Sequence, residues 1–199
     1  MPVYGHAAYA AGQRLKPLSY EPGDLGPYDV EVRTEYCGIC HSDLHLIDDD
    51  WAMSRYPFIP GHEIVGPVTA VGQAVTHLTA GQRVGIGWQA GSCLQCEWCL
   101  AGSENLCPHA VATCVGRHGG YADRVRVDGR FAFAIPDGLD AAGAAPLLCG
   151  GVTVYSPLAA LRGQTLVPCG NCRHRRAGTH GGQVCPRLRV PRHRFLYQP

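Results

Sequence analysis

The sequence predicts a mainly β domain, a barrel or sandwich of many short strands, that also binds metal. Short runs of β-branched or alternating residues recur from the N-terminus to about residue 135. Gly and Pro, 26 and 15 in the 199-residue chain, separate these runs. Many short strands at close spacing are typical of closed or double-sheet architectures. The second observation is a set of cysteines at ligand-like spacing, which predicts metal sites.

The predicted elements follow one another along the chain. Five runs are rich in β-branched or aromatic residues and are bounded by turn residues, as strands are: residues 30–36, 64–71, 83–86, 121–127 and 131–135. Residues 41–46 predict a short helical turn. The Ala-rich residues 139–148 favour a helix that ends at Cys149-Gly-Gly.

Size and composition exclude several classes of protein. With 46% hydrophobic residues, the chain can form one large or two small globular domains. No stretch approaches the ~20 apolar residues that span a bilayer, and the N-terminus lacks the pattern of a signal peptide. Eleven cysteines would suit a secreted disulfide scaffold, but their clustering favours thiolates bound to metal. We therefore expect a cytoplasmic protein with no membrane partner.

The net charge of +1 combines two compositions that meet near Arg162. Residues 1–161 hold 9 Lys and Arg and all 16 Asp and Glu, a charge of −7, whereas residues 162–199 hold 8 Arg and no acid, a charge of +8. The second stretch has neither a helical nor a strand period. We expect residues 1–160 to form the metal-binding domain and residues 161–199 to be an aberrant, disordered Arg-rich tail.

Four thiols lie in one loop that is rich in Gly and polar residues: Cys93, Cys96, Cys99 and Cys107. Spacers of two, two and seven residues let a single loop turn all four sulfur atoms toward one tetrahedral Zn²⁺. A four-cysteine cage has no open position, so the sequence predicts a structural zinc site. Free or disulfide-bonded thiols are the alternative.

A second set of zinc donors is spread along the chain and consists of Cys40, His62 and Cys149. Two thiolates and one imidazole leave the fourth position of a tetrahedral zinc ion open for water or substrate. Such an open position is typical of a catalytic metal.

Neighbouring polar residues can support this chemistry. Asp43 and Glu63 are adjacent carboxylates that can orient the ligands. Ser42 and His45 can pass a substrate proton from a hydroxyl to an imidazole and on to solvent.

Four motifs together resemble the zinc-containing alcohol dehydrogenases of the medium-chain dehydrogenase/reductase superfamily. In chain order they are Gly38-Ile-Cys-His-Ser-Asp-Leu-His, then Gly61-His-Glu with Gly66, Gly72 and Val75, then the four-cysteine loop, then Ala145-Pro-Leu-Leu-Cys-Gly-Gly-Val-Thr-Val-Tyr-Ser-Pro-Leu. The first and last motifs are most similar to the cinnamyl alcohol dehydrogenase branch, which usually takes NADP.

The resemblance implies a GroES-like β-barrel catalytic domain over residues 1–160. It implies reversible NAD(P)-dependent oxidation of a primary alcohol to an aldehyde, with a small-molecule alcohol or aldehyde as partner. Catalytic zinc would lie on Cys40, His62 and Cys149, with Glu63 as an alternative or transient ligand, and structural zinc in the four-cysteine loop. The intact family is homo-oligomeric.

The cofactor domain is where the sequence departs from the family. By resemblance, Ser42 and Thr153 would face the cofactor, NADP or NAD, or the proton relay. However, no Gly-x-Gly-x-x-Gly follows a strand after Leu158, so the cradle for the pyrophosphate is absent from the sequence. We therefore expect a truncated chain without its Rossmann domain, which cannot complete the reaction alone. The rival interpretation is a non-catalytic zinc-binding domain fragment.

The tail allows two other interpretations. Cys169, Cys172, His180 and Cys185 have the spacing of a further zinc site, and the arginines could contact the phosphates of a nucleic acid. We expect neither, because the tail has no interleaved aromatic residues and a frameshift would make its cysteine spacing accidental.

The frameshift hypothesis is testable. One permitted coding of residues 174–187, read one base later, gives Ile-Gly-Gly-Leu-Gly-His-Met-Ala-Val-Lys-Phe-Ala-Arg, and the codon of Arg173 supplies a preceding Gly. That string is the missing dinucleotide fingerprint at the start of a helix. The third base of each original codon is a free choice in this coding. The first base of each shifted codon is not free, because it is the second base of an original codon. We predict that a single-base change near Val167 in the coding DNA restores an open Rossmann frame; if none does, the hypothesis is wrong.

Overall fold

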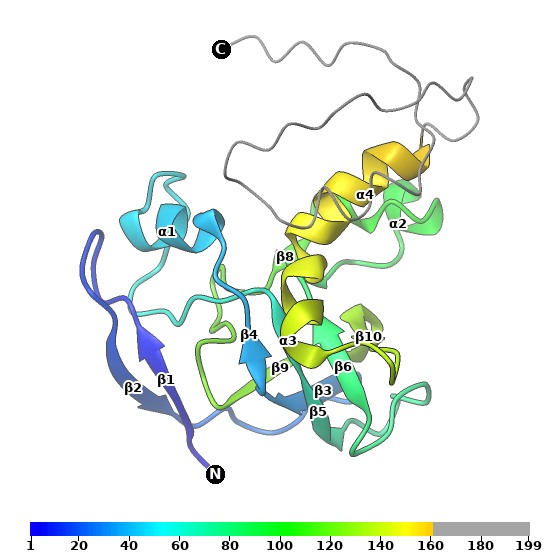
Figure 1. Ribbon diagram of the computed structural model, residues 1–199, viewed down its shortest axis with the longest axis horizontal. Coiled ribbons are helices and arrows are strands. Elements are labelled where there is room, and N and C mark those ends of the chain that lie inside the picture. Colours follow the sequence, from blue (N-terminus) through cyan, green and yellow to red (C-terminus); the bar gives the residue numbers. More distant parts are fainter. Residues whose placement is uncertain (161–199) are drawn as a thin grey trace, which may run out of the picture. The chain divides into compact units, whose positions relative to one another are not determined.

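A computed structural model describes residues 1–160 of the chain (Figure 1). Residues 1–149 form one compact unit, and helix α4 (Gly150–Ala160) belongs to a second unit that begins at Gly150. The expected Arg-rich tail, the cysteines within it and the frameshift hypothesis all fall outside the described residues.

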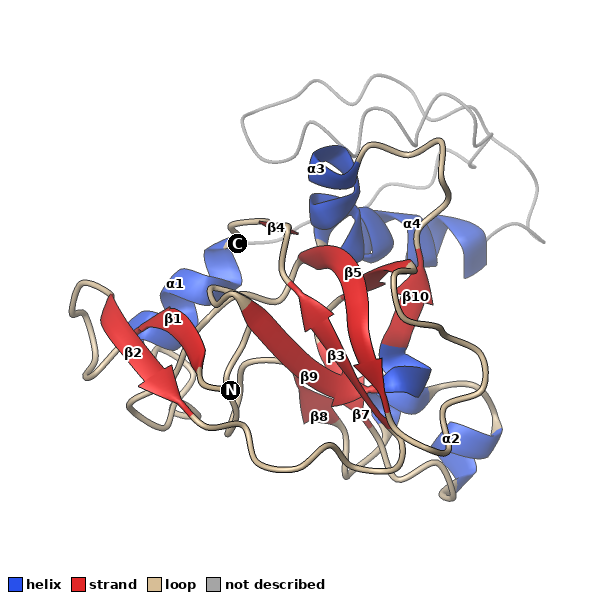
Figure 2. Ribbon diagram, turned by 90° about the horizontal axis from the view of Figure 1, so that it is seen from below, coloured by secondary structure: helices blue, strands red, loops and turns tan. Residues whose placement is uncertain are grey.

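Strands make up most of the regular structure of the first unit (Figure 2). The main sheet has six antiparallel strands in the order β10 (Ala132–Ala134), β6 (Arg83–Ile86), β5 (Ile64–Val71), β3 (Asp29–Arg33) and β9 (Arg124–Asp128), with β4 (Tyr36–Cys37) also paired to β5. Two smaller sheets pair β1 (Val3–Ala7) with β2 (Lys16–Tyr20) and β7 (Gln89–Gly91) with β8 (Val111–Ala112).

The helices of this unit are short. They are α1 (His41–Asp48), α2 (Glu97–Leu100) and α3 (Ala141–Ala144), with 3₁₀ turns η1 (Glu104–Leu106), η2 (Gly129–Phe131) and η3 (Ala145–Leu148). Of these, α3 and η3 follow the last strand, β10. Among the described residues, no single helix is long and apolar enough to cross a membrane, although Ala141–Leu148 with Gly150–Ala160 would meet the length and composition criterion as a bent pair.

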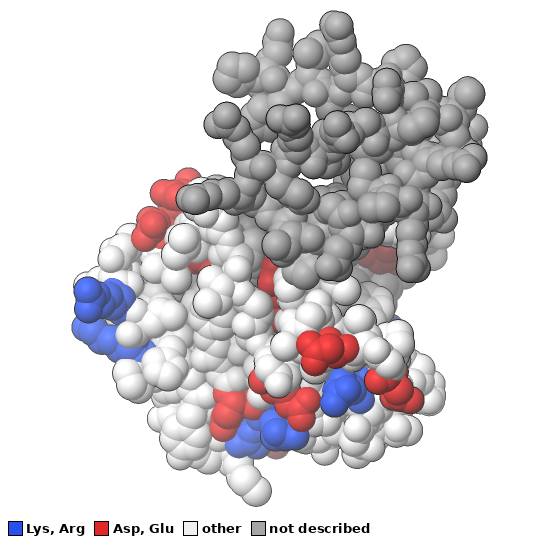
Figure 3. Space-filling view, viewed as in Figure 1, with Lys and Arg blue, Asp and Glu red and all other residues white. Residues whose placement is uncertain are grey.

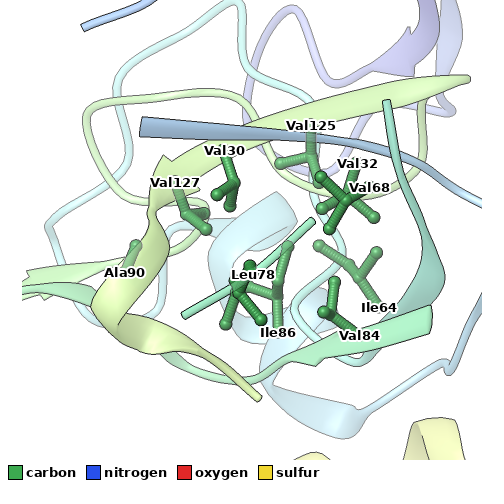
Figure 4. Packing of buried hydrophobic residues seen from close by; sticks show 11 residues of the cluster. Val30, Val32, Ile64, Val68, Leu78, Val84, Ile86, Ala90, Val125 and Val127 are labelled. Atoms are coloured by element: carbon green, nitrogen blue, oxygen red, sulfur yellow. The ribbon is translucent and has the colours of Figure 1, made fainter. Parts of the chain in front are cut away.

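The hydrophobic core is formed where the strands of the main sheet face one another. Its members alternate along the strands, as the two-residue period of a strand requires: Val30, Val32, Ile64, Val68, Leu78, Val84, Ile86, Ala90, Val125, Val127 and Ala132. Figure 4 shows their side chains pointing toward one another from β3, β5, β6 and β9. Burying each large apolar side chain contributes about 1.5–3 kcal/mol.

The charged surface is mixed in sign on the face seen in Figure 3, where acidic and basic side chains lie next to one another over the described residues. Glu35 pairs with Arg33 at 3.0 Å and with Arg83 at 3.8 Å.

The mainly β prediction is confirmed, and some elements coincide with it residue for residue. The runs 64–71 and 83–86 are β5 and β6. The single strand expected over 30–36 is wrong: it divides into β3 and β4, because Thr34 pairs with Asp123 whereas Glu35 turns to pair with Val65. The expected helix over 139–148 divides into α3 and η3, with Pro146 at the start of the 3₁₀ turn.

The core predicts a large penalty for truncating Ile86, which is 0% exposed on β6, an interior strand between β10 and β5. Ile86→Ala should lower the free energy of unfolding by about 2–5 kcal/mol, because the lost methylenes leave a cavity. Urea denaturation of the zinc-loaded protein measures this. Phe133→Ala, at a position that is 57% exposed on the neighbouring strand β10, is the control and should cost far less.

Candidate metal centres

The four-cysteine loop lies between β7 and β8. The sulfur atoms of Cys93, Cys96, Cys99 and Cys107 all lie within 4.8 Å of one another. Sγ–Sγ distances are 3.5 Å for Cys96–Cys99 and for Cys93–Cys107, and 3.9 Å for Cys93–Cys99. A tetrahedron with zinc–sulfur bonds of roughly 2.3 Å has edges of about 3.8 Å, so the arrangement fits a four-thiolate cage.

Local structure explains how one loop gathers four sulfur atoms. Cys96 is the N-cap residue directly before α2, and Cys99 follows three residues later within the helix, so both thiols lie on one side of it. Leu94 (φ 55°) and Gly102 (φ 73°) adopt left-handed backbone that reverses the chain. The disulfide alternative is wrong, because the four thiols are free and their separations far exceed a bonded S–S distance of about 2.05 Å.

Backbone donors already favour negative charge in this loop. The N–H groups of Gln95 and Cys96 lower the pKa of Cys93 to about 6. The N–H of Cys99 also favours the Cys96 thiolate, but burial and the neighbouring sulfur atoms outweigh it and raise the pKa of Cys96 to about 11. The loop therefore stabilises the thiolate form of Cys93 and disfavours that of Cys96. A bound cation would allow all four cysteines to be thiolates at once.

The second centre joins three distant segments of the first unit. Cys40 directly precedes α1, His62 and Glu63 directly precede β5, and Cys149 directly follows η3. Their ligand atoms lie within 4.8 Å of one another. The Sγ atoms of Cys40 and Cys149, which are 109 residues apart in the sequence, are separated by 3.8 Å. The structure thus brings the predicted donor set together.

Glycines make this convergence possible. A Cβ at Gly87 would lie 2.6 Å from the carbonyl oxygen of Leu148, so the glycine lets η3, and with it Cys149, approach β6. A Cβ at Gly38 would lie 1.9 Å from Glu63 Oε2, so the absence of a side chain there lets Glu63 turn toward the centre. Any larger residue at either position would displace a donor.

His62 is oriented for metal binding. The imidazole is fully buried, and its Nδ1 lies 3.0 Å from Asp43 Oδ1. Because a carboxylate accepts, Nδ1 carries the proton and Nε2 presents its lone pair. Within residues 1–160, Nε2 has no hydrogen-bond partner, as expected of a buried nitrogen whose lone pair binds a metal ion. Trp88 packs edge-on against this ring at 5.1 Å.

The electrostatics of the ligands agree with this orientation. Burial would lower the pKa of His62, but the Asp43 carboxylate and nearby thiols raise it overall, so the ring nitrogen attracts positive charge. Burial would raise the pKa of Cys40, but the N–H and hydroxyl of Ser42, His62 and Cys149 lower it overall. A metal cation would take the place of the proton on such donors. Two thiolates and a neutral imidazole are a set that suits zinc.

Asp43 connects the segment that carries Cys40 with the segment that carries His62. It is only 1% exposed, and its carboxylate accepts four hydrogen bonds: Oδ1 from Gly61 N and His62 Nδ1, each at 3.0 Å, and Oδ2 from Cys40 N at 2.9 Å and Tyr121 Oη at 3.0 Å. These bonds outweigh burial and lower the pKa of Asp43. The predicted orienting role of Asp43 agrees with these contacts, whereas Tyr121 carries no signal in the sequence.

The thiol of Cys114 also lies within 4.8 Å of ligand atoms of Asp43 and His62. It belongs to a hydrophobic cluster with Ala8, Leu46 and Phe58, and burial raises the pKa of its thiol. A neutral thiol is a poor ligand, so Cys114 is part of the packing around the centre.

The predicted relay residues lie three positions apart on α1, and hence on one face. Nδ1 of His45 is 2.6 Å from Asp50 Oδ2, and the ring contacts those of His41 at 4.6 Å and Trp51 at 5.0 Å. The contact between His45 and Asp50 carries no signal in the sequence, where Asp50 stands in a run of three acidic residues at 48–50. Thr153 lies on α4 in the other unit, so its contact with a cofactor stays a prediction.

Comparison with known proteins agrees with the fold. The alcohol dehydrogenase GroES-like domain matches residues 26–137. Aldehyde reductase AdhA of Synechocystis is 48% identical over 159 residues, which are 80% of this chain and 47% of that protein. The chain therefore spans about half the length of such relatives.

Solved structures give the same result. Cinnamyl alcohol dehydrogenase SbCAD4 of Sorghum bicolor superposes with a TM-score of 0.77 at 43% identity, over 80% of this chain and 48% of that one. The protein CAD of Helicobacter pylori, in complex with NADP(H), superposes with a TM-score of 0.79 at 33% identity, over 84% of this chain and 51% of that one. The chain belongs to the alcohol dehydrogenase GroES-like domain family of the medium-chain dehydrogenase/reductases.

Proposed function

We propose that this chain is the zinc-binding catalytic domain of an alcohol dehydrogenase that interconverts a primary alcohol and an aldehyde with NADP or NAD. The observation that carries the proposal is that the ligand atoms of Cys40, His62 and Cys149 converge. Within residues 1–160 the buried Nε2 of His62 has no hydrogen-bond partner. The names of the relatives, an aldehyde reductase and cinnamyl alcohol dehydrogenases, support the substrate class. The NADP(H) complex supports the cofactor.

The two centres would have different tasks. Cys40, His62 and Cys149 would hold the catalytic zinc. Glu63, whose carboxylate belongs to the same group, would act as an alternative ligand when water or substrate leaves the fourth position. When bound there, zinc supplies a Lewis acid that lowers the pKa of a substrate hydroxyl. The four-cysteine loop has no open position and would hold structural zinc.

The residues of α1 would remove the proton. Ser42 lies beside Cys40, where its hydroxyl can accept a proton from the substrate. Asp50 accepts from Nδ1 of His45 and so leaves Nε2 free to receive that proton. The His45 side chain is 35% exposed, which gives the proton a path to solvent.

Hydride transfer needs the nicotinamide at near-attack distance. Ser42 and Thr153 would contribute contacts to it from this part of the chain. The cytoplasmic location is part of the same proposal, and localisation of the tagged chain would check it. The homo-oligomeric state is expected of the intact family and not of this truncated chain, and gel filtration would check that.

The two centres predict two zinc ions per chain. Cys40→Ser should leave one ion with the fold intact, because its site is open. Cys99→Ser should also leave one ion but lower the melting temperature, because its cage holds the loop together. Elemental analysis after removal of excess metal measures the content. Cys37→Ala, at a thiol whose pKa burial raises to about 12, is the control and should keep both ions. A folded protein with negligible zinc would refute the proposal.

The expectation that the chain lacks the pyrophosphate cradle means that it should not complete the cycle efficiently by itself. Measurable NADPH consumption by the purified chain with cinnamaldehyde or benzaldehyde would therefore favour the enzyme over the non-catalytic fragment. His45→Gln should lower kcat by about 10²–10⁴-fold without changing the zinc content, because a general acid–base residue is lost. His6→Gln, on strand β1, is the control. Two bound zinc ions without NADPH binding or turnover would instead favour a non-catalytic zinc-binding domain.

A further inference from the structure

Within residues 1–160, Tyr121 is the one donor to Asp43 that lies outside the segments that carry the proposed metal ligands. The other three donors are the N–H groups of Cys40 and Gly61 and the ring of His62, all within the segments that carry the metal donors. Tyr121 follows Gly120 at the entry to β9, and its hydroxyl donates to Asp43 Oδ2 at 3.0 Å. The carboxylate that connects two ligands is therefore held from a third part of the fold.

The backbone of Tyr121 is fixed on both sides. Its N–H donates to the carbonyl of Pro60 at 2.9 Å, and its carbonyl accepts from the N–H of His6 at 2.9 Å. These bonds anchor the residue to β1 and to the segment that precedes His62. A side chain anchored in this way can set the position of the carboxylate that it contacts.

The ring of Tyr121 also packs against the turn that presents His62. Gly61 has a φ of 100°, which favours glycine, and a Cβ there would lie 2.6 Å from Tyr121 Cδ1. The aromatic ring thus occupies the space beside Gly61. Burial raises the pKa of Tyr121, so the phenol remains a neutral donor.

We propose that Tyr121 is a positioning residue of the catalytic zinc centre, whose hydroxyl holds Asp43 so that Cys40 and His62 are presented together. This inference rests on the proposed function, because it concerns the same three ligands. Without the hydroxyl, Oδ2 keeps only the Cys40 N–H, and the carboxylate can turn away from His62. The four-cysteine loop has no part in this set of bonds, so the effect should be confined to one of the two metals.

The test is the zinc affinity of Tyr121→Phe, measured by competition with a chromogenic chelator. Loss of a residue that supports a metal ligand typically weakens metal binding about 10–100-fold, and we expect a loss of that size for the zinc of the Cys40–His62–Cys149 centre. The four-cysteine zinc should bind as in the wild type. In the cobalt-substituted protein, the thiolate-to-cobalt absorption of the Cys40–His62–Cys149 site should shift.

The matched control is Tyr56→Phe. It removes a hydroxyl that donates to the carbonyl of Ile47 at 2.7 Å, at the end of α1, without touching Asp43. A structural role alone would make both variants lose thermal stability and keep their zinc affinity. Asp43→Asn should weaken the same zinc, and adding Tyr121→Phe to it should cause little further loss, because the two residues act through one bond.

The outcomes separate the two proposals. Two zinc ions in the wild type, with unchanged affinity and an unchanged cobalt spectrum in Tyr121→Phe, would overturn the role of Tyr121 and leave the proposed function standing. A wild type that binds only the four-cysteine zinc would overturn both. Additive losses in the Asp43 and Tyr121 double variant would also contradict the inference.

Discussion

Repulsion between closely packed thiolates is the constraint on which the rest of this structure depends. Sulfur atoms approach one another to 3.5–3.9 Å in the loop and to 3.8 Å in the second centre. Two unit charges at about 4 Å repel by about 4 kcal/mol at the effective dielectric constant of a protein surface. Backbone donors favour the thiolate of Cys93, but they cannot neutralise four such groups. Under the proposed function, metal binding and folding of this loop are therefore one process.

The second centre meets the same constraint with groups from distant segments. The loop closes around its sulfur atoms by itself, whereas Cys40 and Cys149 meet only because β4 pairs with β5 and glycine lets η3 approach β6. Asp43 then fixes the relative orientation of Cys40 and His62 through four hydrogen bonds. A rigid sheet and one buried carboxylate thus replace the short spacers that hold the four-cysteine loop.

Sequence predicts this protein well wherever the signal is local. Runs of β-branched residues define β5 and β6, and cysteine spacing defines the whole four-cysteine cage. The small strands escape prediction, because β2 contains Pro17 and exposed positions, and β7 ends in Gly91. Donors that are 109 residues apart carry no local signal, so the family resemblance was needed to group them. Tyr121 and Asp50 become visible only through the atoms that they contact.

The unit that holds both centres ends at Cys149, the last of the metal donors. Every sulfur, nitrogen and carboxylate that either ion needs has therefore been synthesised before Gly150 is added. Both proposed donor sets are therefore complete within residues 1–149, and neither needs a side chain from any later residue.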